Sequence, residues 1–185
     1  MNFGEGADEP VKTLLVGMGN PILCDDAVGI RLAQHIQSRL GLVPDLTVSE
    51  ECSIGGLNIL DLLAGYERLI VLDSIKTAIA LPGHWYRFTA ESLQKTMNLN
   101  NIHDTNFATA LALGRRLGMR LPEDRDIHIF AVEVLDNLTF AEQMTGPLEQ
   151  AFYTYAEEIL MEIAEMLELR LELYQSPCSD QHISP

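Results

Sequence analysis

The chain has 185 residues, of which 47% are hydrophobic and 21% are charged, a size and composition typical of one soluble globular domain. Its formal net charge of −15 argues against nucleic acid and anionic membranes as partners, because neutralising phosphate groups requires clustered Lys and Arg. Its three widely spaced cysteines form no CxxC pair, which argues against a zinc knuckle and indicates a reducing compartment.

The two ends of the chain are expected to be less ordered than its middle. No apolar run approaches the roughly 18–20 residues that span a bilayer. The N-terminal stretch MNFGEGADEP lacks the basic start of a secretory signal. We therefore expect a cytoplasmic protein, with a flexible leader over residues 1–10 and a flexible tail over residues 175–185.

Segments with strand and helix patterns alternate between these ends. In chain order, strands are predicted at residues 12–18, 45–51, 68–74, 84–90 and 126–135, and helices at residues 26–40, 55–65, 106–118 and 146–173. The strand RLIVLDS is apolar almost throughout, as in sheets that are covered on both faces. The alternation predicts a single α/β domain over residues 11–174, with a mostly parallel twisted sheet flanked by helices on both faces. In such sheets, ligands bind outside the carboxyl ends of the strands.

The loop after the first strand, GMGNPILCDD, carries glycines followed by two acids. Gly17 and Gly19 allow a tight turn, and Asn20 precedes a proline that favours an extended backbone. A dinucleotide fingerprint is not predicted, because the third glycine is absent and the acids repel phosphate. Asp25 fits the N-cap of the next helix, whereas Asp26 points roughly 100° away and is free to face the cleft.

Cys24 in the same loop is a thiol to be considered as a nucleophile. The charges of Asp25 and Asp26 beside it would raise the pKa of the thiol, which opposes formation of the reactive thiolate. We therefore expect Cys24 to be a small packing residue.

Two more polar residues stand near the same edge of the predicted sheet. Asp73 ends an apolar strand, where a carboxylate is costly to bury without water, a donor or a cation. His103 lies in IHDTNF, just ahead of a helix, whereas the other histidines lie in predicted strands, a helix or the tail. Asp26, Asp73 and His103 form an oxygen–nitrogen set that suits a divalent transition ion such as nickel or zinc, with coordination positions left open.

Three segments, GMGNPILCDDAVGI, RLIVLDSI and IHDTNFATAL, resemble in order and spacing the maturation endopeptidases of nickel–iron hydrogenases. The similarity runs from about Thr13 to Ala151 and so covers most of the chain. The resemblance implies a twisted sheet flanked by helices. It also implies removal of a C-terminal extension from the hydrogenase large-subunit precursor after nickel insertion.

By this resemblance, Asp26, Asp73 and His103 recognise nickel already held by the precursor, and Asp26 stands where some members carry Glu. Asp26 and Asp73 are the catalytic candidates of an aspartic-type endopeptidase, without a pepsin-like dyad. No permanently bound cofactor is implied, although other divalent ions would fit the site, and a monomer is expected. The residues that support the loop around the first acid are Gly17, Gly19, Asn20 and Asp25.

Two other functions stay open. A maturation chaperone or metal sensor would bind the precursor through the same residues without cutting it. A peptidyl-tRNA hydrolase-like esterase also begins with a strand that runs into Gly-x-Gly-Asn-Pro. Such an enzyme needs a basic face for tRNA and an early histidine, whereas this chain carries a charge of −15 and no histidine before His35.

Overall fold

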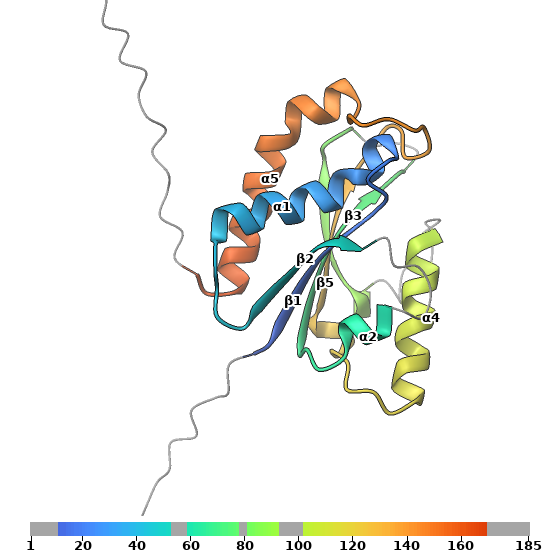
Figure 1. The fold of residues 1–185 in the computed structure, drawn as a ribbon, viewed down its shortest axis with the longest axis vertical. Coiled ribbons are helices and arrows are strands. Elements are labelled where there is room, and N and C mark those ends of the chain that lie inside the picture. The colour runs from blue at the N-terminus through green and yellow to red at the C-terminus, as the bar shows by residue number, and fades with distance from the viewer. Residues whose placement is uncertain (1–10, 53–58, 78–80, 93–101, 170–185) are drawn as a thin grey trace, which may run out of the picture.

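The computed structural model describes residues 11–52, 59–77, 81–92 and 102–169. The described residues form a five-stranded sheet in the order β2-β1-β3-β5-β4 (Figure 1). Its strands are β1 (Thr13–Met18), β2 (Leu46–Cys52), β3 (Arg68–Ile75), β4 (Trp85–Thr89) and β5 (Ile127–Glu133). All neighbouring strands pair in parallel except β4, which lies antiparallel to β5 at one edge.

Helices cover both faces of this sheet (Figure 1). One face carries α1 (Val28–Leu40) and α5 (Gly146–Met166), and the other carries α2 (Ile59–Leu63) and α4 (Ile102–Arg116). The mostly parallel three-layer α/β class predicted from the alternating pattern is therefore confirmed. The predicted leader and tail lie outside the described residues.

The sheet separates two apolar cores. On one face, Leu15, Ile70 and Phe130 pack with the buried side chains of α1 and α5. On the other face, Leu14 and Val71 pack with α2 and α4. Neighbouring residues of a strand point to opposite faces, so β3 contributes side chains to both cores, as its apolar sequence predicts.

The helix predicted over residues 26–40 is divided in two. The 3-10 turn η1 (Cys24–Ala27) comes first, and the α-helix α1 begins only at Val28. Asp26 therefore lies in the 3-10 segment η1 and not at the start of the α-helix, where it was predicted.

Glycines bring α1 unusually close to the sheet. A Cβ atom on Gly29 would lie 2.3 Å from the carbonyl oxygens of both Met18 and Leu72, and one on Gly17 would lie 2.5 Å from the Gly29 carbonyl oxygen. Real Cβ atoms do not approach other atoms so closely, so glycine is required at this contact. The contact holds the start of α1 directly over the carboxyl ends of β1 and β3.

Helix α5 buries an apolar stripe against the sheet but ends earlier than predicted. It stops at Met166, and Glu168 has a left-handed backbone (φ 54°), which turns the chain out of the helix. The remainder of the predicted helix, residues 170–173, lies outside the described residues.

Two of the glutamates on the polar side of α5 bind a neighbouring strand. Glu158 accepts a hydrogen bond from Trp85 Nε1 (2.8 Å), and Glu162 accepts one from Arg87 (2.9 Å). Both donors belong to β4, so these bonds tie the edge strand to the helix that covers it. Among the described residues, no helix combines the length and apolar character needed to cross a membrane.

Candidate functional site

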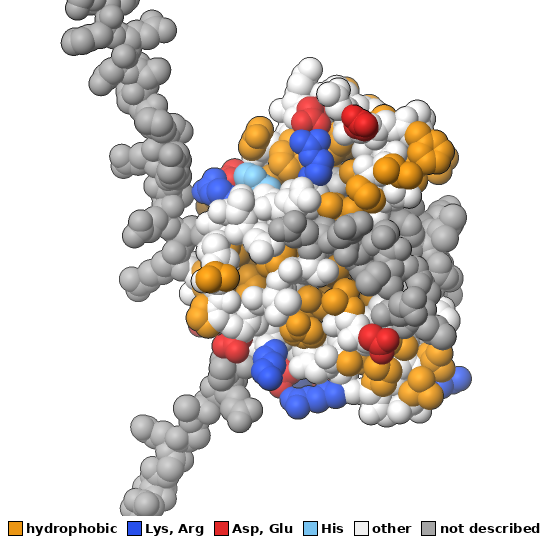
Figure 2. Space-filling model, viewed as in Figure 1, with side chains coloured by type: hydrophobic (Ala, Val, Ile, Leu, Met, Phe, Trp, Pro, Cys, Tyr) orange, Lys and Arg blue, Asp and Glu red, His pale blue; other side chains and the backbone are white. Residues whose placement is uncertain are grey.

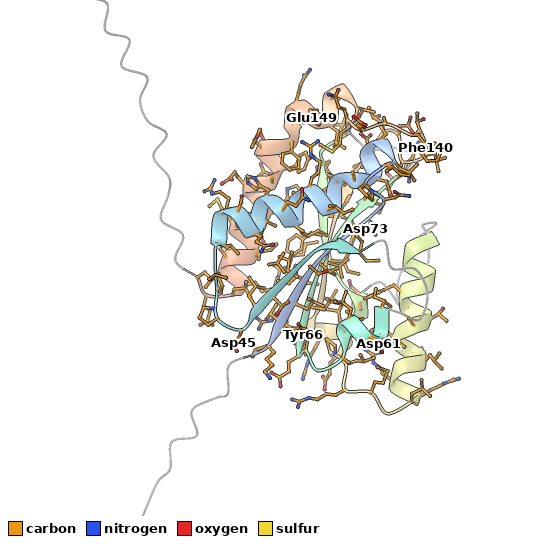
Figure 3. All side chains as sticks on the ribbon, in the orientation of Figure 1. Asp45, Asp61, Tyr66, Asp73, Phe140 and Glu149 are labelled. Atoms are coloured by element: carbon orange, nitrogen blue, oxygen red, sulfur yellow. The ribbon has the colours of Figure 1, made fainter. Side chains whose placement is uncertain are left out.

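Two buried carboxylates lie at the carboxyl end of β3. Asp73 lies on β3 and Asp26 lies in η1, and they are only 4% and 5% exposed. Ser74 links them: its backbone N–H donates to Asp73 Oδ1 (2.7 Å) and its hydroxyl donates to Asp26 Oδ1 (2.9 Å). Figure 3 shows Asp73 at this end of the strand, between α1 and α4. The structure therefore brings two of the three predicted site residues to one edge of the sheet.

The glycine loop holds the second oxygen of Asp26. Gly19 has a φ of 140°, and a Cβ atom there would lie 1.9 Å from the Asp26 carbonyl oxygen. The next backbone N–H, that of Asn20, donates to Asp26 Oδ2 (2.9 Å). Asp26 was predicted to be free to face the cleft, whereas in the structure both of its oxygens accept hydrogen bonds. Each carboxylate oxygen has two lone pairs, so capacity for a further partner remains.

Asp25 was predicted to cap the helix that follows it, and this prediction is wrong. No side chain caps the N-terminus of η1 or α1. The Asp25 carboxylate is fully buried and accepts hydrogen bonds from the backbone N–H groups of Leu135 (3.0 Å), Asp136 (2.9 Å) and Thr145 (2.6 Å), and from the Thr145 hydroxyl (3.0 Å). Asp25 therefore anchors the segment between β5 and α5, while its neighbour Asp26 faces β3.

His103 lies within α4, as its second residue, and not ahead of the helix as predicted. Its helix covers the face of the sheet toward which Asp73 points, because Asp73 lies two residues after Val71 on β3 and α4 packs in the Val71 core. The imidazole itself is outside the described side chains. Convergence of all three groups therefore stays a prediction, and no three His, Cys, Asp or Glu side chains of the described part form a group able to hold a metal ion.

Cys24 is buried, as expected of a packing residue. Burial, the charge of Asp25 and the charge of Asp136 raise the pKa of its thiol. The thiol lies 3.4 Å from the carbonyl oxygen of Gln143. A buried thiol with a raised pKa carries little thiolate, so the structure gives no support to a cysteine nucleophile.

Sequence reasoning missed two polar residues at this edge. Ser74 immediately follows Asp73, and only the tertiary contact with Asp26 reveals its linking role. Glu133 ends β5 with 1% exposure, and its Oε1 accepts a hydrogen bond from the backbone N–H of Thr77 (2.5 Å). Its position as an acid that ends the apolar run IFAVE is the same signal that identified Asp73, so Glu133 could have been found in the sequence.

Two surface hollows of the described residues lie at the opposite end of the strands. The larger, of about 560 Å³, is lined by residues that include Thr13, Leu46 and Arg68, each the first residue of its strand. The smaller, of about 320 Å³, also includes Arg68. Because ligands of α/β sheets bind at the carboxyl ends, neither hollow competes with the carboxylate edge as the candidate site.

Comparison with known proteins relates this geometry to a family. A model of the family described as hydrogenase maturation protease matches residues 30–162, which include Asp73 and His103 and begin four residues after Asp26. The hydrogenase 2 maturation protease of Escherichia coli strain K12 is 29% identical over 73 residues, which are 40% of this chain and 44% of that protein. The aligned part thus spans less than half the length of that relative.

Solved structures of similar proteins share the fold. The hydrogenase maturating endopeptidase HybD from E. coli has a TM-score of 0.70 and 22% identity, over 84% of this chain and 94% of that chain. The [NiFe] hydrogenase maturation protease HybD from Thermococcus kodakarensis has a TM-score of 0.61 and 18% identity, over 85% of this chain and 99% of that chain. The family match alone covers well over half of the sequence, and the chain therefore belongs to the hydrogenase maturation protease family.

Proposed function

We propose that this chain is an endopeptidase that removes the C-terminal extension of a nickel–iron hydrogenase large-subunit precursor after nickel has been inserted. Membership of the hydrogenase maturation protease family is the observation that carries this proposal. Two buried carboxylates at the carboxyl end of β3, each of which accepts a hydrogen bond from Ser74, support it. The same family match favours this activity over that of a peptidyl-tRNA hydrolase.

In the proposed site, Asp26, Asp73 and His103 recognise the nickel that the precursor carries. Carboxylate and imidazole groups are ordinary ligands for such an ion, and the metal belongs to the substrate. The loop of Gly19 and Asn20 orients Asp26 through the hydrogen bond to Oδ2. Because Ser74 already fixes one oxygen of each acid, both carboxylates are preorganised for the metal.

Two ways of using the metal follow from this arrangement. In the first, nickel polarises the scissile carbonyl while one of the carboxylates activates a water molecule. In the second, nickel only reports that the precursor is loaded, and cleavage proceeds without a bond between the metal and the scissile group. In neither case do Asp25 and Asp26 act as a proton-sharing dyad, because their side chains bind different elements.

The direct test is the mass of the large subunit before and after incubation with the protein. We expect loss of a C-terminal peptide from the nickel-loaded precursor and no loss from the nickel-free precursor. Asp26→Asn, Asp73→Asn and His103→Ala should each reduce cleavage by at least about a hundredfold, the magnitude seen when a group that stabilises a reacting centre is removed.

The control variant is Asp61→Asn, which changes an exposed acid on α2 and should cleave at the normal rate. Normal cleavage by all three site variants would contradict the assigned residues. An unchanged precursor mass together with tight binding would favour a chaperone or metal sensor. Cleavage at equal rates with and without nickel would exclude both ways of using the metal.

A further inference from the structure

An exposed apolar surface lies on two paired loops beside the carboxylate edge. It comprises four large side chains that are between 43% and 77% exposed, and we call this set the apolar platform: Ile22, Leu135, Leu138 and Phe140. Figure 2 shows hydrophobic side chains at the upper right of the molecule, where Figure 3 labels Phe140. Such residues are normally buried, so four on adjoining loops require an explanation.

The platform is held in place by backbone hydrogen bonds between its two loops. Ala141 N–H donates to the Ile22 carbonyl (3.2 Å), and Cys24 N–H donates to the Thr139 carbonyl (3.0 Å). Leu23 and Phe140 form an isolated antiparallel bridge. Two loops joined in this way present their side chains in one arrangement, which lowers the entropy lost when a partner binds.

The loop between β5 and α5 carries Leu135, Leu138 and Phe140, and we call it the platform loop. It is also stabilised by hydrogen bonds within itself and with a residue next to the site. Asp136 Oδ1 accepts hydrogen bonds from the backbone N–H groups of Leu138 and Thr139, each 3.0 Å long. The buried carboxylate of Asp25 holds both ends of the same loop, through Leu135 and Thr145. Asp25 is the chain neighbour of Asp26, so this loop is attached next to the carboxylate edge.

The other large apolar side chains exposed in the described part of the chain belong to other elements and loops. They are Val11, Leu42, Leu81, Leu117, Tyr153 and Met161. Single exposed apolar residues are common on soluble proteins, whereas a cluster beside a functional edge is typical of a binding surface. Because the platform lies beside the carboxylate edge, we expect its partner to be the molecule that binds at that edge.

We propose that the apolar platform docks the protein substrate, by seating an apolar segment of the hydrogenase large-subunit precursor close to the bond that is cut. This rests on the proposed function. The loop that carries most of the platform is anchored by Asp25, the chain neighbour of Asp26, so a segment seated on the platform lies near the site that recognises the substrate's metal. Asp136 and the exposed Glu142 lie in the platform loop of a chain whose net charge is −15, so the segment it fits is apolar with a basic residue nearby.

The test compares platform variants with a matched control in the full chain. Phe140→Ser and Leu138→Ser should lower kcat/KM for the nickel-loaded precursor by at least about tenfold, through KM, because central apolar contacts dominate interface affinity. kcat at saturating precursor should be unchanged, since neither side chain belongs to the carboxylate site. Leu117→Ser removes a side chain of similar exposure (68%) just beyond the far end of α4 and should change neither constant.

Binding of the precursor measured directly separates the two proposals. If the wild type cuts the precursor and the platform variants keep normal KM and dissociation constant, the docking proposal is wrong and the proposed function stands. If the wild type binds without cutting and the platform variants lose affinity, the docking proposal stands and the proposed function is wrong. A wild type that neither binds nor cuts overturns both.

A separate experiment tests the claim that a basic residue lies near the docked apolar segment. Glu142→Lys should slow association with the precursor and flatten the dependence of the association rate on salt, because a positive side chain repels a basic segment. A faster association would show that the docked segment is acidic and would overturn this claim. Equal thermal unfolding temperatures of the variants and the wild type establish that the compared proteins are folded alike.

Discussion

At the scale of single residues, the adjacent acids Asp25 and Asp26 differ in what surrounds them. Asp25 is fully buried and accepts four hydrogen bonds from the segment between β5 and α5. Asp26 accepts one from Asn20 and one from Ser74. A carboxylate that accepts four hydrogen bonds has used its acceptor capacity and serves the structure. One that accepts two keeps lone pairs that can bind a ligand. Of these two neighbouring acids, Asp26 is therefore the one suited to contact a substrate.

Gly29 is the residue whose replacement should damage the fold most directly. In Gly29→Ala the new methyl would lie 2.3 Å from two backbone carbonyl oxygens of the sheet, and backbone cannot move as a side chain can. We expect a loss of about 3 kcal/mol in the free energy of unfolding, because such overpacking outweighs the better helix propensity of Ala. Urea denaturation measures it. Gly146→Ala at the start of α5, where the methyl meets nothing within 4 Å, should not destabilise, and equal losses in both variants would refute the steric explanation.

Asp136 should contribute to acid sensitivity. The Thr139 hydroxyl and the backbone N–H groups of Leu138 and Thr139 lower the pKa of Asp136 from its usual 3.8 to about 2. Since the folded chain binds this proton less readily than the unfolded chain, the contribution is complete above pH 3.8 and is lost as the pH falls toward about 2. The unfolding free energy of Asp136→Asn should therefore decline less steeply across this interval than that of the wild type. Parallel slopes would show that these bonds do not favour the charged carboxylate.

At the scale of elements, α5 is the helix that closes one core. Its buried stripe packs against α1 and the sheet, and its polar side is attached by ion pairs. Arg31 of α1 makes two hydrogen bonds to Glu149, of 2.5 Å and 2.8 Å. Such partly exposed pairs contribute little, up to about 1 kcal/mol each, so the apolar stripe supplies most of the attachment.

Tyr155 is the one polar side chain in this stripe, and its loss should stabilise the helix. Its hydroxyl is buried without a hydrogen-bond partner in the part of the chain that the structure describes, and this burial raises the pKa of Tyr155. Tyr155→Phe should raise the free energy of unfolding by about 1 kcal/mol, because the buried hydroxyl no longer needs to be dehydrated. Chemical denaturation measures the gain. Tyr153→Phe, on the exposed side of α5, should have no effect, and a loss of stability in Tyr155→Phe would reveal a partner for the hydroxyl.

At the scale of the whole molecule, the charge is strongly unbalanced. The net charge of −15 arises from 27 acidic and 12 basic residues, and several of the basic ones are engaged in ion pairs, such as Arg39 with Glu157 and Arg87 with Glu162. The remaining acids repel one another across the surface. This repulsion opposes the compact state and favours basic partners at the same time.

Salt should therefore stabilise the isolated protein. At an ionic strength of about 0.5 M, counterions screen the repulsion between distant acids more effectively than they weaken short ion pairs. We expect the thermal unfolding temperature to rise by a few degrees relative to low salt. Scanning calorimetry in NaCl and KCl measures the change, and equal shifts in both identify screening as the cause. A falling temperature would mean that the ion pairs contribute more to stability than the repulsion costs.

The sequence by itself determined the order of strands and helices, the mostly parallel sheet and the acids at its carboxyl edge. These follow from local features: apolar runs, helical periodicity, and a polar residue such as Asp73 that ends an apolar strand. It did not locate the partners of Asp25, because Leu135 and Thr145 are 110 and 120 residues away and no local pattern records such distances. The tertiary structure decided that Asp25 is structural, that Ser74 joins Asp26 to Asp73, and that apolar side chains gather on two paired loops. Each of these depends on segments brought together only when the sheet forms, when burial forces every carboxylate to find donors.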